Sequence, residues 1–205
     1  MNLYAYWLKT ASPKTALWCL LCGLLASCSV SAPRQIDNIC VIFEEKSRWY
    51  KQAARASKRW NVPIAVNMAI MKQESRFVSK AKPARSRILW LFPGPRKSNA
   101  YGYSQAKKET WNWYKREANH RGADRNDFDD AIDFIAWYNH ISVKKIGIRS
   151  HDAFSLYLAY HEGHTGFKRR TYYKKAWLKK IAGQVQATAN AYSTQLKKCE
   201  KKLAR

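Results

Sequence analysis

The chain has 205 residues, a length that suits one domain with a proper core. Lys and Arg number 38 against 14 Asp and Glu, which gives a net charge of +24 at pH 7. Nine Trp and twelve Tyr argue against a disordered polycation. So high a charge calls for a polyanionic neighbour, either nucleic acid or the carboxylates and phosphates of a cell envelope.

Residues 1–27 are predicted to be a lipoprotein signal peptide. Two lysines precede an apolar stretch at residues 16–25, which is too short for a membrane span. The Leu-Ala-Ser-Cys run that ends at Cys28 fits a lipobox, so we expect lipidation of Cys28, and Ser29 after it favours the outer membrane. An ordinary signal peptide or an uncleaved apolar anchor is the alternative. Export argues against nucleic acid as a partner and favours peptidoglycan.

The mature chain is predicted to form one domain without an internal repeat. We expect a tether at residues 28–40, a catalytic domain at 41–199 and a basic tail at 200–205. Cys40 and Cys199 lie near the two ends of that domain. In an oxidising periplasm, two cysteines so placed are expected to form a disulfide. We expect a monomer anchored to the membrane by its lipid.

Helical periodicity runs through most of the mature chain and predicts an all-helical fold. The expected helices cover residues 40–60, 63–77, 107–118, 127–142, 150–162 (capped by Ser150 and stopped by Gly163) and 174–198. Residues 78–99 differ, because prolines interrupt a basic segment that contains Ile88-Leu89-Trp90-Leu91-Phe92. We expect a loop or flap with an apolar tip, and its length suggests a function.

A candidate acid closes the second predicted helix, in the run Gln73-Glu74-Ser75-Arg76-Phe77. Glu74 follows Ile70 and Met71 by about one turn, so it leaves the helix near its apolar face. Apolar surroundings favour the neutral form of a carboxyl group. A neutral carboxyl is what a general acid needs to protonate a glycosidic oxygen. A purely structural or solvated glutamate at a helix end is the alternative.

Two further motifs follow in order, Ala100-Tyr101-Gly102-Tyr103-Ser104-Gln105 and Ala159-Tyr160-His161-Glu162-Gly163. Together with the Glu74 motif they resemble the soluble-type lytic transglycosylases. That family has Glu-Ser and an aromatic, then Gly-(Leu)-(Met)-Gln, then Ala-Tyr-Asn-x-Gly. The resemblance spans residues 49–177. It implies an all-α, single lysozyme-like domain, from the wider α+β lysozyme-like superfamily, with a substrate cleft.

The resemblance implies a reaction carried by Glu74 alone. Glu74 would protonate the oxygen between N-acetylmuramic acid and N-acetylglucosamine, and its carboxylate would then deprotonate the muramoyl 6-hydroxyl. A 1,6-anhydro ring closes without consuming water. The resemblance implies that no metal or organic cofactor is required. The substrate is the glycan strand of peptidoglycan. A non-catalytic basic lipoprotein that binds the wall is the alternative from another class.

The resemblance also implies which residues line the cleft. Ser75 and Gln105 correspond to polar groups of the sugar cleft, and Gly102 to a turn glycine that lets backbone approach the glycan. Tyr160 corresponds to the tyrosine whose hydroxyl faces the catalytic carboxyl. Two positions of the cleft wall follow by the same correspondence: Tyr138 and Asn139.

Glu162 is the departure from the family pattern that bears on the reaction. Facing the cleft as a second carboxylate, it would permit hydrolysis, as in a lysozyme-like muramidase. The alternative, favoured by its position on another side of the helix from the preceding tyrosine, is solvent or a pair with Arg169 or Arg170. His161 and His164 lack the spacing of the helical zinc motif, so no metal site is predicted.

Overall fold

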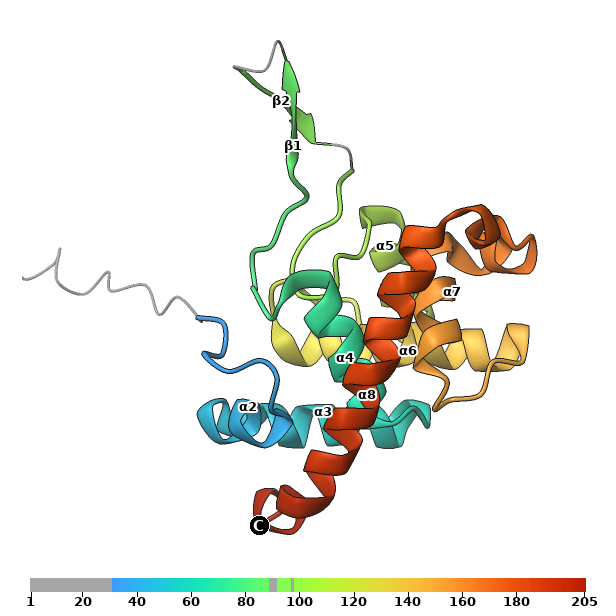
Figure 1. Ribbon diagram of the computed structural model, residues 1–205. Coiled ribbons are helices and arrows are strands. Elements are labelled where there is room, and N and C mark those ends of the chain that lie inside the picture. The colour runs from blue at the N-terminus through green and yellow to red at the C-terminus, as the bar shows by residue number, and fades with distance from the viewer. Residues whose placement is uncertain (1–30, 89–91, 97) are drawn as a thin grey trace, which may run out of the picture. The chain divides into compact units, whose positions relative to one another are not determined.

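The computed structural model describes residues 31–88, 92–96 and 98–205. The expected signal peptide and Cys28 lie outside these residues. Helices dominate: α2 (Ile39–Glu45), α3 (Ser47–Trp60), α4 (Ile64–Ser75), α5 (Lys108–Glu117), α6 (Phe128–Ile146), α7 (Ala153–Lys168), the 3-10 helix η2 (Thr171–Lys174) and α8 (Ala176–Leu203). Strands β1 (Arg85–Ile88) and β2 (Phe92–Arg96) form one hairpin (Figure 1). The predicted helical fold class is confirmed, although the expected all-helical domain also contains this hairpin. None of the helices described here is both long and apolar enough to cross a membrane.

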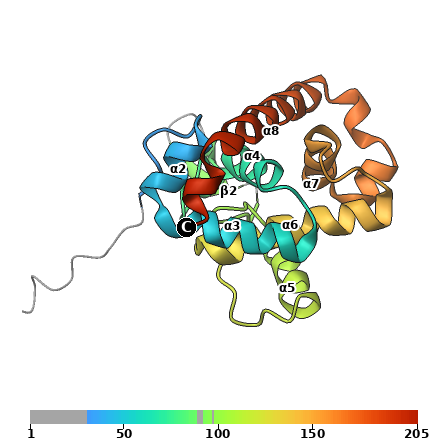
Figure 2. The same ribbon diagram turned by 90° about the horizontal axis from the view of Figure 1, so that it is seen from below.

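The helix at the centre of the fold is α4. Its residues from Ile64 to Met71 are all buried, as expected of a helix that is apolar on every side. It packs against α3, α6, α7 and α8, and Figure 2 shows it with α8 on one side and α3 and α6 on the other. The helix ends at Ser75, because Arg76 takes a left-handed conformation with φ 51°. Glu74 therefore sits in the last turn of the most enclosed helix.

Several helix boundaries differ from the prediction, and the clearest cases have a local cause. The expected helix at residues 40–60 is two helices, since Lys46 has non-helical angles of φ −114° and ψ 70°. Asp152, not Ser150, caps α7, and its side chain accepts a hydrogen bond from the backbone N–H of Ser155. Gly163 (φ 73°, ψ 161°) is non-helical and interrupts α7 where the stop was predicted, but a further helical segment follows and continues to Lys168.

The two ends of the domain are joined, as predicted, by a disulfide between Cys40 of α2 and Cys199 of α8. The helix α8 continues to Leu203, into the expected basic tail. Core packing also begins upstream of residue 41, because Ile36 and Ile39 are buried and the Tyr192 hydroxyl donates to the Ile36 carbonyl. The expected tether thus contributes to the folded body.

The segment expected to be a loop or flap contains the hairpin of β1 and β2. Its strands pair antiparallel, and the Ser86 hydroxyl donates to the Pro95 carbonyl over 2.9 Å. Prolines fit here because a two-stranded sheet consists of edge strands. In Figure 1 the hairpin extends away from the helices. The centre of the predicted apolar tip, residues 89–91, lies outside the described residues.

Candidate active site

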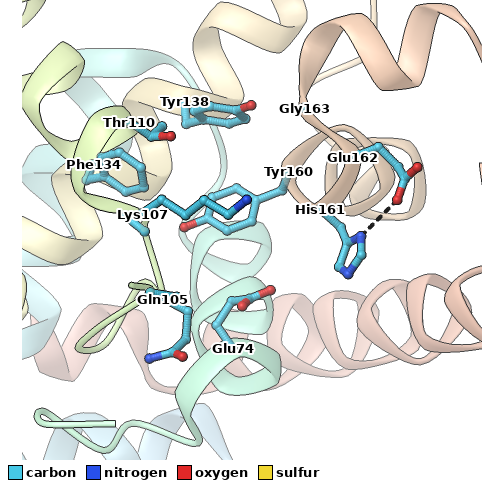
Figure 3. A pocket seen from close by; sticks show the side chains of 12 residues that line it. Glu74, Gln105, Lys107, Thr110, Phe134, Tyr138, Tyr160, His161, Glu162 and Gly163 are labelled. Carbon is cyan, nitrogen blue, oxygen red and sulfur yellow. Dashed lines mark hydrogen bonds and ion pairs between the residues drawn. The ribbon is translucent and has the colours of Figure 1, made fainter. Parts of the chain in front are cut away.

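A cleft of about 430 Å³ lies where α4, α5, α6, α7 and the segment before α5 meet. Figure 3 shows the side chains that line it. They combine two carboxylates, one lysine, several aromatic rings and small polar groups: Glu74, Ala100, Gln105, Ala106, Lys107, Thr110, Phe134, Tyr138, Tyr160, His161, Glu162 and Gly163. Five residues of the predicted site are thereby brought together: Glu74, Gln105, Tyr138, Tyr160 and Glu162.

Glu74 lies at the floor of this cleft, partly open to solvent and otherwise enclosed by protein. Burial raises the pKa of its carboxyl from 4.5 to about 7, and contact with the Tyr157 hydroxyl opposes part of that rise. The group therefore holds its proton at pH values where an ordinary glutamate is ionised. At neutral pH it can both give and take a proton, which is the property general acid–base chemistry requires.

Two tyrosines one turn apart on α7 surround Glu74. The Tyr160 ring lines the cleft, and its hydroxyl donates to the Ser104 carbonyl over 2.7 Å. Tyr157 is the tyrosine whose hydroxyl lowers the pKa of the Glu74 carboxyl. Sequence reasoning missed Tyr157, although its i, i+3 spacing from Tyr160 places both on one helix face.

Replacing Tyr157 with phenylalanine is expected to raise the pKa of Glu74 above its value of about 7. The hydroxyl stabilises the ionised carboxylate, so its loss favours the proton-bound form. NMR titration of ¹³C-labelled glutamate side chains, assigned with Glu74→Gln, measures this pKa directly. Tyr173→Phe is the matched control, since Tyr173 is 55% exposed and lies outside the cleft. An unchanged or lowered pKa in Tyr157→Phe would contradict the contact.

The turn that precedes α5 is held by Gly102 and Gln105. Gly102 has φ 77°, and a Cβ at this position would overlap the carbonyl oxygen of Arg125. The glycine therefore serves backbone packing inside the protein, and it does not line the cleft as expected. The Gln105 amide donates to the carbonyls of Ala81 (3.0 Å) and Gly102 (2.8 Å), which fixes its side chain in the cleft beside Glu74 (Figure 3).

Two predicted cleft residues lie elsewhere. Ser75 is buried, and its hydroxyl donates to the Met71 carbonyl one turn back over 3.2 Å. Asn139 is fully buried, and its amide donates to the Asn67 side chain over 3.0 Å. The Ser75 hydroxyl and the Asn139 amide nitrogen thus form their hydrogen bonds inside the fold, and neither residue lines the cleft.

Tyr138 forms a wall of the cleft, as expected of its position in the sequence. Its ring meets Tyr160 edge-on with centroids 5.3 Å apart, and it stacks on His164 with centroids 4.5 Å apart. Burial raises the pKa of its hydroxyl to about 12. The wall is therefore aromatic and uncharged at physiological pH, a surface that suits the apolar faces of sugar rings.

Glu162 also reaches the cleft, but its charge is already matched. The Lys175 ammonium lies 2.8 and 2.9 Å from its two oxygens, the Thr171 hydroxyl donates to it, and His161 Nδ1 is 3.0 Å away. Burial would raise its pKa, yet these partners outweigh burial and lower it to about 2. Glu162 pairs with a basic residue, as one alternative predicted, but the partner is Lys175 and not Arg169 or Arg170. The Glu162 side chain is only 5% exposed, so it does not point into solvent.

Several other lining residues were missed by sequence reasoning, among them Lys107, Thr110 and Phe134. Lys107 could have been found from the sequence, because it follows the predicted cleft residue Gln105 by two positions, in the segment that enters α5. In the described part of the chain, no group of three or more His, Cys, Asp or Glu side chains is arranged to hold a metal ion.

Residues 16–199 match the family model described as Transglycosylase SLT domain. No curated protein and no solved structure gives a significant match to the chain. The matched range covers most of the chain and includes the Glu74 turn, the Gly102–Gln105 turn and the α7 motif. The chain therefore belongs to the family of transglycosylase SLT domains.

Proposed function

We propose that this protein cleaves the bond between N-acetylmuramic acid and N-acetylglucosamine, with Glu74 as its single general acid and base. Membership of the transglycosylase SLT family implies lytic transglycosylase activity on peptidoglycan. One observation carries the finer proposal. Glu74 has a pKa of about 7 in a cleft whose other carboxylate, Glu162, is neutralised by Lys175.

In the proposed reaction, the protonated Glu74 donates its proton to the glycosidic oxygen as the bond to the muramoyl C1 breaks. The oxocarbenium-like centre is stabilised by the substrate's own N-acetyl group. The Glu74 carboxylate then takes the proton of the muramoyl 6-hydroxyl, whose oxygen bonds to C1 and closes the 1,6-anhydro ring. The pKa of about 7 suits one group to both steps. The Tyr157 hydroxyl, in contact with the carboxyl, stabilises it when ionised.

Hydrolysis would instead need a second carboxylate free to act as nucleophile or to activate water. Glu162 is the candidate in the cleft, but its pKa of about 2 makes it a poor base. Its oxygens are also occupied by Lys175 and Thr171, which leaves little capacity to orient a water molecule. These contacts favour the transglycosylase reaction over the muramidase one.

Digestion of purified sacculi tests the proposal, because 1,6-anhydro products are lighter by one water than reducing-end products. We expect the wild-type protein to release anhydro-muropeptides, identified by mass spectrometry. Glu162→Gln is expected to give the same anhydro products, since its carboxylate takes no part in the chemistry. Purely reducing-end products would establish the muramidase instead. Binding to sacculi without any cleavage would establish the non-catalytic scaffold.

A peptidoglycan substrate and the Cys40–Cys199 disulfide are those of a cell-envelope protein. We further propose, from the lipobox that ends at Cys28, that a lipid holds the domain at the outer membrane, facing the periplasm.

A further inference from the structure

Among the residues that the structure describes, the charges that line the cleft leave one cation without an ion-pair partner. Glu162 is paired with Lys175, and its ionised form is fixed by three hydrogen-bond partners. Glu74 is held largely in its neutral form up to about pH 7 by burial. Neither of the two acids that line the cleft is therefore a counter-ion for Lys107, which is the one lysine or arginine among the described residues of the lining.

Lys107 stands directly before α5 and extends its side chain into the cleft. In the view of Figure 3 its side chain extends into the cleft, and its ammonium is drawn between the labelled Tyr138 and Glu74. Among the described residues it takes part in no salt bridge. The nearby acid Glu109 accepts a hydrogen bond from Asn99 and feels the charges of Lys107 and Lys108 together. That acid does not form an ion pair with Lys107.

An unpaired ammonium beside an acid kept neutral gives the cleft a local excess of positive charge. A neutral sugar cannot compensate such a charge, whereas a carboxylate can form a charge-assisted hydrogen bond with it. The Lys107 side chain is itself exposed at the rim of the cleft, so a carboxylate can reach its ammonium without displacing protein groups.

We infer that Lys107 binds a carboxylate of the substrate and makes the cleft selective for acid-bearing glycan over neutralised glycan. This inference rests on the proposed function and adds the recognition of one chemical group. Two sources of that group exist in peptidoglycan: the carboxylates of the stem peptide, and the lactyl carboxylate that is free where the peptide has been removed.

The test compares cleavage of glycan strands before and after carbodiimide coupling has converted their carboxylates to neutral amides. We expect the wild type to lose roughly two- to fivefold in kcat/KM on amidated strands, the scale of one exposed charge-assisted contact. Lys107→Gln is expected to lose a similar factor on untreated strands and nothing further on amidated ones. Using peptide-bearing and peptide-free strands in parallel identifies which carboxylate is bound.

Lys108→Gln is the matched control, because it removes the same charge from an exposed neighbour that does not line the cleft. It reports how much of any loss comes from the overall charge of +24. Equal losses in the two variants, or a Lys107→Gln variant that still discriminates against amidated strands, would overturn the inference. Failure of the proposed function looks different, since the wild type would then release no anhydro products from any strand.

Discussion

Replacing Glu74 with glutamine is expected to reduce the release of anhydro-muropeptides from sacculi by at least about a thousandfold. Glutamine cannot donate a proton to the glycosidic oxygen or take one from the 6-hydroxyl, and each such transfer contributes about 10²–10⁴-fold. Glu162 cannot substitute, because Lys175 and Thr171 hold its carboxylate. Turnover is measured by mass spectrometry of soluble products, with binding to sacculi measured on the same samples.

The same variant supplies its own control for folding. The pKa of Glu74 is raised from 4.5 to about 7, so folding disfavours its ionised form. The resulting cost is absent below pH 4.5 and complete above pH 7. Since the group is partly open to solvent, we expect Glu74→Gln to be about 1–3 kcal/mol more stable than wild type at pH 8, and equally stable at pH 4. A variant that is inactive but less stable at pH 8 would show damage to the fold instead.

The helices could be predicted because their signal is local. The apolar run from Ile64 to Met71 can only be a buried element, and Pro63 before it marks where the helix starts. Glu74 then falls in the last turn next to this apolar surface, so its raised pKa could be anticipated from sequence. The disulfide followed from the compartment and from the positions of two cysteines near the domain ends.

The polar partners could not be predicted, because they come from distant segments. Gly102 is required by the carbonyl of Arg125 in another loop, which no pattern around the glycine records. Ser75 has a motif position typical of a cleft residue, yet its hydroxyl bonds back within its own helix. Lys175 reaches Glu162 across 13 residues of chain because Gly163 kinks α7 between them. Sequence spacing alone favoured the nearer arginines.

The hairpin was missed for a different reason. Pro93 and Pro95 lie within β2, and proline in a short segment ordinarily argues against a strand. A two-stranded sheet has only edges, so the missing N–H groups can face away from the partner strand. The expected flap is therefore partly ordered by backbone pairing, supported by Ser86 and its bond to the Pro95 carbonyl.

Removing the disulfide is expected to lower the free energy of unfolding by about 2–5 kcal/mol. The bond between Cys40 and Cys199 closes a loop of 159 residues, for which the chain-entropy model gives about 5 kcal/mol. The loss in unfolding free energy is expected at the lower end of this range if α2 and α8 remain associated through other contacts. Two such contacts join the Gln195 side chain to the backbone of Ile39 (3.0 Å) and Asp37 (3.1 Å).

Urea unfolding of a Cys40→Ser/Cys199→Ser variant measures this loss against the wild type. A reducing agent should lower the stability of the wild type toward that of the variant and leave the variant unchanged. Because neither cysteine lines the cleft, cleavage of sacculi at 25 °C should persist while the variant remains folded. Equal unfolding free energies for the two proteins would mean that the packing of α2 on α8, and not the covalent bond, holds the ends of the domain together.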